Sequence, residues 1–278
     1  MKKLFDDLSF KISKETTKQY STSFSLGILA LSSKIRNSIY AIYGYVRLAD
    51  EIVDSFHGYD KGKLLSRFRD ETFLALEEKI SLNPILQSFQ ETVNRFQIDH
   101  ELIKQFLKSM EMDLHKIDYN SELYKEYILG SAEVVGLMCL HIFVDGNKNE
   151  FENLKPYAMM LGSAFQKVNF LRDMKDDYNV LGRTYFPNVD ITAFDNKIKA
   201  EIEKEITFEF REALEGIKKL PTSSRFGVYL AFRYYLSLFK KIKKTSANQM
   251  INQRIRISNR KKISLMMGCY VEYKILSL

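Results

Sequence analysis

The sequence predicts an all-α protein, and two observations carry that prediction. Only 4 prolines and 12 glycines punctuate the 278 residues, which is too few turn-forming residues for a sandwich or barrel of many short strands. Through most of the chain, apolar residues also recur at the spacing of helices. We expect a single domain over residues 1–278, because no repeat or linker divides the chain and its length is near the upper limit for one core.

Short groups of turn-forming residues separate the predicted helices. Two of these helices contain stretches, 39–49 and 132–143, that are apolar nearly all round, which is typical of central helices surrounded by others. The separating residues are Ser32-Ser33, Gly58, Asn83-Pro84, Gly146-Asn147, Pro187 and Pro221. The predicted helices span residues 12–30, 33–56, 61–80, 84–95, 99–116, 121–144, 150–180, 195–219, 223–246 and 258–276.

The net charge of +7 comes entirely from the C-terminal fifth of the chain. Between Gly216 and Val271 there are 13 Lys and Arg and no Asp or Glu, whereas residues 1–215 hold 34 acids and 28 bases. Such a basic segment favours an anionic partner: nucleic acid, an acidic membrane or a phosphorylated small molecule. Nucleic acid is disfavoured, because the basic run 240–244 lies on an apolar helix without an RNA- or DNA-binding motif.

The sequence also predicts a cytoplasmic protein. Acidic residues follow the N-terminal Lys2 and Lys3 too early for a signal peptide. Cys139 and Cys269 cannot form a disulfide framework, and no Cys/His cluster has the spacing of zinc ligands. No run of about 18 uninterrupted apolar residues predicts a membrane-spanning helix.

A first acidic motif follows the apolar and aromatic stretch 39–46. Asp50 and Asp54 are four residues apart, so their carboxylates share one helix face, with Glu51 beside them. Adjacent carboxylates at the end of a buried helix repel one another unless a cation compensates them. The alternative is a solvated helix end, since the pattern is short and common.

A second polar stripe places Asn169, Asp173 and Asp177 at positions i, i+4 and i+8 of a predicted helix. Arg172 flanks the stripe, and Gln166 lies one turn earlier. Oxygen ligands from two such helices are what Mg²⁺ takes together with substrate phosphates. An exposed acidic helix face is the alternative for this stripe taken alone.

Together the two motifs resemble those of the squalene/phytoene synthase family of head-to-head prenyltransferases, and the chain looks most like a bacterial phytoene synthase. Residues 47–54 match the first aspartate-rich motif of the family, and residues 169–177 match its Asn-x-x-Arg-Asp-x-x-x-Asp motif. The resemblance extends over most of the chain. Further matching segments are Tyr20-Ser21-Thr22-Ser23-Phe24, Ala132-Glu133-Val134-Val135-Gly136, Gly182-Arg183-Thr184-Tyr185-Phe186-Pro187 and Arg233-Tyr234-Tyr235.

One position departs from the family pattern. Members commonly carry a tyrosine three residues before the position of Ala132, where it is thought to assist diphosphate release or proton handling. This chain has Leu129 there, and Tyr127 need not point into the same cavity.

The resemblance implies an isoprenoid-synthase-type helical bundle around a central apolar cavity. The leading expectation is a phytoene synthase that condenses two geranylgeranyl diphosphates through a cyclopropyl diphosphate, in carotenoid biosynthesis. One alternative is a C30 squalene or dehydrosqualene synthase using farnesyl diphosphate, and another is a non-catalytic membrane-associated or assembly protein on the same fold. No nucleotide cofactor is expected, because neither GxGxxG nor a P-loop is present.

The resemblance also implies roles for individual residues. Mg²⁺, with Mn²⁺ as an alternative, is expected to be the cofactor, and prenyl diphosphates the substrates. Peripheral contact with the inner membrane face is expected through the basic segment 234–262, and the oligomeric state is open. The expected metal ligands are Asp50, Glu51, Asp54, Asn169, Asp173 and Asp177. The expected catalytic residues are Asp50, Asp54, Asp173, Asp177, Arg47 and Tyr235. The expected substrate-binding residues are Ser21, Phe24, Tyr43, Arg47, Val134, Val135, Gly136, Gln166, Asn169, Arg172, Arg183 and Tyr235.

Overall fold

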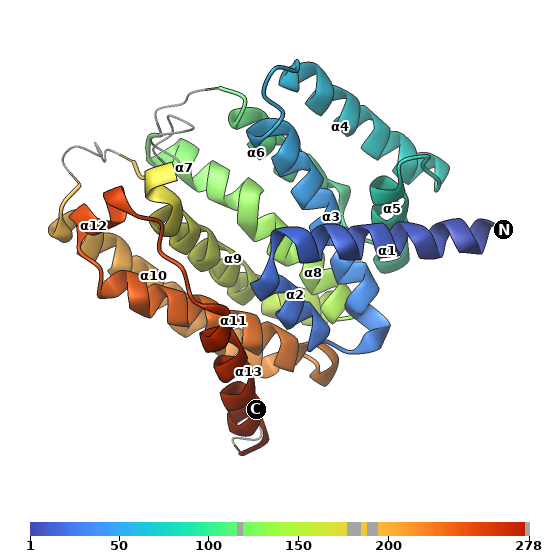
Figure 1. Ribbon diagram of the computed structural model, residues 1–278. Helices are drawn as coiled ribbons and strands as arrows, with labels where there is room; N and C mark the ends of the chain where they lie inside the picture. The colour runs from blue at the N-terminus through green and yellow to red at the C-terminus, as the bar shows by residue number, and fades with distance from the viewer. Residues whose placement is uncertain (116–118, 177–184, 188–193, 276–278) are drawn as a thin grey trace.

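The computed structural model confirms the all-α prediction. It describes residues 1–115, 119–176, 185–187 and 194–275, and these residues contain helices and no strand (Figure 1). The helices are α1 (Lys2–Tyr20), α2 (Thr22–Leu29), α3 (Ser33–Asp54), α4 (Lys61–Glu78), α5 (Pro84–Phe96), α6 (His100–Met112), α7 (Ser121–Ile128), the π-helix η1 (Leu129–Glu133), α8 (Val134–Phe143), α9 (Lys148–Asp176), α10 (Asn196–Lys219), α11 (Thr222–Lys243), α12 (Ala247–Asn252) and α13 (Asn259–Ile275).

Local capping explains where most of these helices begin. The helix predicted over 12–30 is in fact two helices, because Ser21 takes an extended conformation between α1 and α2. The Ser21 hydroxyl accepts a hydrogen bond from the Phe24 backbone N–H at 3.2 Å and so caps α2. Asn83, Asp99 and Asp195 cap α5, α6 and α10 in the same way. The break at Ser21 matters because it turns α2 toward the centre of the molecule, where Phe24 lines a cavity.

The helix predicted over 121–144 is interrupted by the π-helical turn η1. Gly130 in this turn lies against α6, and Gly162 of α9 approaches the Ala132 carbonyl from the other side. A Cβ atom on Gly130 would lie 2.7 Å from the Gln105 carbonyl oxygen, and one on Gly162 would lie 2.8 Å from the Ala132 carbonyl oxygen. Both positions require glycine, because the close neighbours are backbone atoms that cannot rotate away.

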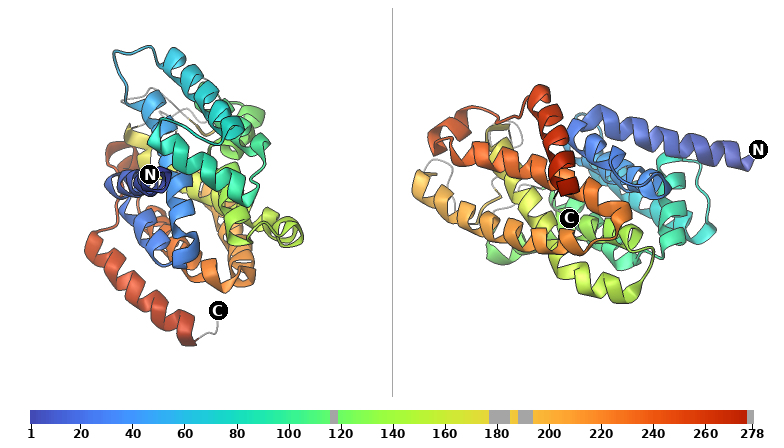
Figure 2. Two further views of the ribbon diagram at one scale, coloured as in Figure 1. Left: turned by 90° about the vertical axis from the view of Figure 1, so that its right-hand side faces the viewer. Right: turned by 90° about the horizontal axis from the view of Figure 1, so that it is seen from below.

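The buried side chains form two clusters. One joins α3, α4, α5 and α6, and at its centre the Tyr45 ring stacks on Phe89 with 3.7 Å between ring centroids. The other joins α9, α10 and α11. In Figures 1 and 2, α8 and α9 lie between α3 on one side and α10 and α11 on the other.

A buried ion pair fixes α10 against α9. The Lys167 ammonium donates to the Glu209 carboxylate at 2.6 Å and also bonds Glu205, while the Ser163 hydroxyl donates to Glu209 at 2.7 Å. Lys167 and Glu209 are both buried. A buried charge of either sign would be costly alone, so this pairing sets which faces of the two helices meet.

Among the residues that the structure describes, one stretch, Ser121–Phe143, is long and apolar enough to cross a membrane by length and composition. It comprises α7, η1 and α8. These elements pack against α3, α6 and α9. The core helices of soluble proteins have the same length and composition, so this stretch is weak evidence for a span.

We predict that Gly130→Ala lowers the free energy of unfolding by about 1–3 kcal/mol, because the added methyl group overlaps the α6 backbone. Urea denaturation followed by circular dichroism measures this. Gly62→Ala is the matched control: a Cβ there lies 3.6 Å from the nearest atom, so the change should stay within about 0.5 kcal/mol. Equal effects of the two substitutions would contradict the close approach at Gly130.

Candidate active site

A cavity of about 560 Å³ lies inside the helical bundle. It is lined from α2, α3, α8, α9, α10 and α11, and its size is typical of a small-molecule site. Charged and polar side chains line one part of it, and apolar side chains from Leu31, Leu140, Leu161 and Ile217 line another. The cavity therefore suits an amphiphile with an anionic or polar head and a long apolar tail.

The first polar wall comes from the C-terminal turns of α3. The Arg47 guanidinium lies 3.8 Å from Asp50, bonds Glu51 and stacks 4.2 Å above the Tyr20 ring. Asp50 and Asp54 line the cavity. Glu51 is not among the lining residues, because its carboxylate is turned onto Arg47.

Burial raises the pKa of Asp50 to about 7; Arg47 opposes the rise, and the carboxylates of Asp54 and Asp113 add to it. About a third of the Asp50 side chain is exposed (32%), but that surface faces the cavity inside the molecule, so burial remains the main cause. Burial disfavours the charged form of this carboxylate, and a cation bound beside it would favour that form.

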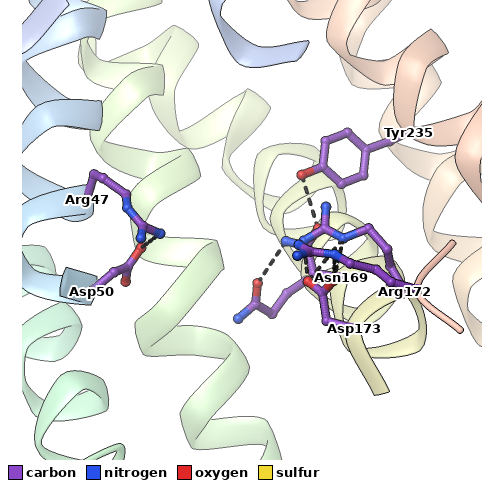
Figure 3. A network of polar contacts seen from close by, with 8 residues as sticks. Arg47, Asp50, Asn169, Arg172, Asp173 and Tyr235 are labelled. Atoms are coloured by element: carbon purple, nitrogen blue, oxygen red, sulfur yellow. Dashed lines mark hydrogen bonds and ion pairs between the residues drawn. The ribbon is translucent and has the colours of Figure 1, made fainter. Parts of the chain in front are cut away.

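The second polar wall comes from α9 and faces the first across the cavity (Figure 3). Asp173 accepts from the Arg172 Nε at 3.0 Å and pairs with Arg254 at 2.7 Å. Asn169 donates to Gln166 at 3.3 Å and accepts from the Tyr235 hydroxyl at 3.2 Å. Two cations therefore already neutralise Asp173, at the place where an anionic ligand would meet the wall.

The oxygen donors of both walls fit a hard cation. Carboxylate and amide oxygens are the ligands that Mg²⁺ takes, usually as one or two protein carboxylates together with phosphate oxygens. Over the described part of the chain, no three His, Cys, Asp or Glu side chains are close enough together to hold an ion by themselves. The arrangement suits ions that are shared between each wall and a phosphorylated ligand.

Aromatic rings connect the polar walls to the apolar part of the cavity. Tyr235 stacks on Phe165 at 3.8 Å, and Phe24 lies 5.7 Å from Tyr235 and 5.2 Å from Tyr43. Burial raises the pKa of Tyr43 and of Tyr235, so both hydroxyls stay neutral. Neutral rings without nearby water can stabilise a positive charge through their faces.

The structure corrects the interpretation of position 129. Leu129 packs against the cluster of α3 and α6 and does not line the cavity, whereas Tyr127 does. The Tyr127 hydroxyl donates to Asp113 at 2.7 Å, and the Tyr185 hydroxyl reaches the same carboxylate at 3.4 Å. Burial holds the pKa of Tyr127 well above its usual value. A tyrosine therefore lines the cavity despite Leu129.

Most of the other predicted residues line the cavity. Val134, like Glu51, does not line it: Val134 is buried in the cluster of α3 and α6, because Val134, Met138 and Ile142 form the α8 stripe that faces those helices. The adjacent positions Val135 and Gly136 face the cavity instead. Asp177 and Arg183 lie outside the described residues. The predicted residues that line the cavity are Ser21, Phe24, Tyr43, Arg47, Asp50, Asp54, Val135, Gly136, Gln166, Asn169, Arg172, Asp173 and Tyr235.

Sequence reasoning missed many lining residues, and three of them contact residues of the two polar walls or Tyr127. Asp113 is a single carboxylate outside either acidic motif, and Ser131 belongs to the π-helical turn, where it accepts from Gln166 at 3.2 Å. Arg254 was included only as part of the basic segment. Nothing in local spacing indicated that these three side chains meet the motifs.

Comparison with known sequences gives consistent matches. The sequence model of the squalene/phytoene synthase family matches residues 17–261. The chain is 29% identical to phytoene synthase 2 of Solanum lycopersicum, covering 90% of this chain and 86% of that protein. It is 26% identical to phytoene synthase of Arthrospira platensis, covering 92% and 90%. Against phytoene synthase of Narcissus pseudonarcissus it is 28% identical, but spans only 64% of that protein's length.

Solved structures share the fold. A dehydrosqualene synthase crystallised with a ligand superposes with a TM-score of 0.81 over 97% of this chain and 98% of that one, at 22% identity. A squalene synthase from Alicyclobacillus acidocaldarius gives a TM-score of 0.74 over 85% and 93%, at 20% identity.

We predict that Tyr127→Phe lowers the free energy of unfolding by about 1–3 kcal/mol, because the buried Asp113 carboxylate loses the hydrogen bond that Tyr127 donates. Chemical denaturation gives the value. Tyr59→Phe, at a tyrosine that is 73% exposed, should change stability by less than about 0.5 kcal/mol. A Tyr127→Phe variant as stable as the wild type would show that the bond to Asp113 contributes nothing.

Proposed function

This chain belongs to the squalene/phytoene synthase family, whose members are prenyltransferases, and we propose that it joins two geranylgeranyl diphosphates head to head to give phytoene. One observation carries the proposal: Asp50 and Asp54 of the first motif and Asn169 and Asp173 of the second line one cavity that continues into an aromatic and apolar space. The relatives named phytoene synthase support the C20 substrate and a place in carotenoid biosynthesis.

The proposed reaction is a sequence of ionisations. Cleavage of the allylic C–O bond of one substrate releases diphosphate and leaves a carbocation, which the double bond of the second substrate captures. Proton loss closes a cyclopropane ring that still carries the second diphosphate. Cleavage of that C–O bond, rearrangement and a second proton loss give the conjugated triene of phytoene, so no reductant is consumed and no nucleotide cofactor is needed.

The residues of the polar walls would bind the diphosphate heads. Asp50, Asp54, Asn169 and Asp173 are the described oxygen donors that would hold Mg²⁺ or Mn²⁺, and Asp177 is expected to join them. When bound, the metal neutralises diphosphate and makes it a better leaving group. The cavity-facing guanidinium groups of Arg47, Arg172 and Arg254 can donate to remaining phosphate oxygens in pairs.

The rest of the cavity would protect the cation. Phe24, Phe165 and Tyr235 exclude water from the reacting carbons, and their faces favour positive charge. The neutral Tyr127 hydroxyl donates its one proton to Asp113 and would hold that carboxylate in place beside the cavity. We propose these roles from the placement of the side chains around one cavity.

Two alternatives remain within this fold. A C30 synthase using farnesyl diphosphate is favoured by the structural likeness to squalene and dehydrosqualene synthases. A non-catalytic assembly protein is disfavoured, because the sequence keeps Asp50, Asp54, Asp173 and Asp177.

We propose peripheral contact with the cytoplasmic face of the membrane through α13. One face of this helix packs on α11, where Arg233 pairs with Glu272. The opposite face is apolar and exposed, and its exposed side chains are Ile263, Met267, Tyr270 and Val271. Exposed basic residues precede this stripe, at Arg256, Arg260 and Lys261. A basic and apolar helix face of this kind fits an anionic lipid surface, and the proposed C40 product is insoluble in water.

To test the reaction, purified protein would be incubated with farnesyl and geranylgeranyl diphosphates together in Mg²⁺, with diphosphate and hydrocarbon measured. We expect a C40 hydrocarbon and loss of turnover on chelation. Asp50→Ala and Asp173→Ala should each lower turnover by at least about a hundredfold, because charge on the leaving group is no longer compensated. A C30 product would favour the alternative, and no product from either substrate would refute the proposal.

The matched control is Asp70→Ala, at an exposed carboxylate on α4 outside the cavity. It should keep full turnover. Full activity in Asp50→Ala or Asp173→Ala would contradict the metal roles, provided that circular dichroism shows both variants folded.

For membrane contact, we predict that the wild type floats with vesicles containing phosphatidylglycerol and not with phosphatidylcholine alone. Arg260→Glu with Lys261→Glu should weaken binding by about 1 kcal/mol or more per residue, and Met267→Asp should weaken it through the apolar stripe. Lys63→Glu with Arg67→Glu, on exposed α4 positions, is the control for net charge. Equal effects of the two charge reversals would contradict docking through α13.

A further inference from the structure

The cavity extends along α9 from the polar wall to Tyr157. Asp173 and Tyr157 both line it, and they are sixteen positions apart on the same helix, which is about 24 Å of helix length. Leu154, Ala158 and Leu161 line the same stretch. A prenyl chain whose diphosphate is held at Asp173 would therefore point its far end toward Tyr157.

The Tyr157 ring lies between this end of the cavity and the surface. Its hydroxyl accepts a hydrogen bond from the Lys219 ammonium at 3.0 Å, and the same ammonium lies 4.6 Å from the ring centroid. Lys219 is exposed, whereas Tyr157 is half-buried. The ring thus has one part toward the cavity and its hydroxyl toward solvent, held by a cation at the end of α10.

Gly216 makes the room that this ring occupies. A Cβ atom at Gly216 would lie 2.6 Å from the Tyr157 Cγ and closer still to its Cβ. Any larger residue would push the ring away, and the Lys167–Glu209 pair that joins α9 to α10 leaves little freedom for the helices to separate. The ring position therefore follows from the contact of the two helices.

We infer that Tyr157 is the floor of the prenyl tunnel, clamped by Lys219, and that it determines the longest chain that the cavity accepts. The inference rests on the proposed function, since it takes the occupant to be a prenyl diphosphate. Removing the ring should extend the cavity toward the surface and admit one further isoprene unit. The phenol hydroxyl takes no part in the chemistry at the distant polar walls.

The test measures binding rather than turnover. Geranyl, farnesyl, geranylgeranyl and geranylfarnesyl thiolodiphosphates, whose C–S bond resists ionisation, would be titrated calorimetrically into the full chain in Mg²⁺. In the wild type we expect affinity to fall by at least about tenfold at the first chain that is too long. Tyr157→Ala should bind that first over-long chain without the fall in affinity.

Three further variants sharpen the result. Tyr157→Phe keeps the ring, so the longest chain bound should be that of the wild type. Lys219→Met removes the cation that holds the ring, so the loss of affinity for the first over-long chain should be smaller than in the wild type. Tyr157→Leu removes the ring with less loss of apolar volume, so it carries the test if Tyr157→Ala does not fold. Tyr59→Ala, at an exposed tyrosine, is the control.

The outcomes separate the two hypotheses. If the wild type binds the shorter diphosphates, and the longest chain bound is the same in Tyr157→Ala or Tyr157→Leu, then Tyr157 does not set the chain length. The proposed function would be unaffected by that result. If Tyr157→Phe lengthens the longest chain bound as much as Tyr157→Ala does, the ring is not what sets the chain length, and the inference is also refuted. If the wild type binds none of these diphosphates, both the proposed function and the role of Tyr157 in setting chain length are refuted.

Discussion

Negative charge held inside a helical bundle is the constraint on which the site depends. Asp50 and Asp54 end a helix that is buried along much of its length, and Asp173 faces them from α9. Burial raises the pKa of Asp50 to about 7; the carboxylates of Asp54 and Asp113 add to the rise and Arg47 opposes it. The second wall is neutralised by Arg172 and Arg254. Cations shared between the carboxylates of the two walls and a diphosphate, with the arginines beside that diphosphate, would complete the balance of charge.

The shape of the cavity depends on backbone contacts rather than on charge. Gly130 and Gly162 let α6 and α9 approach the π-helical turn from opposite sides. The α8 helix that follows directs Val134 into the core and Val135 toward the cavity. A π-helical turn of this kind is frequent at functional sites, because it changes which side chains face a ligand without ending the helix.

The excess of basic residues near the C-terminus serves several sites. Arg254 pairs with Asp173, Lys219 bonds Tyr157, and Arg233 holds α13 onto α11 through Glu272. Composition indicated one anionic partner for the whole segment. In the structure, part of this charge contacts other residues of the protein, at the polar wall and beside Tyr157 at the opposite end of the cavity, and Arg260 is among the basic residues left at the surface.

The sequence alone determined the helical fold, most helix positions and the two acidic motifs, because helical periodicity and the spacing of Asp50 from Asp54 are local properties. It could not determine how each helix is rotated in the bundle. That rotation placed Tyr127 rather than Leu129 in the cavity and removed Val134 from it. Nor could local spacing show that Arg254 reaches Asp173, since contacts between residues distant in sequence are decided only when the helices pack.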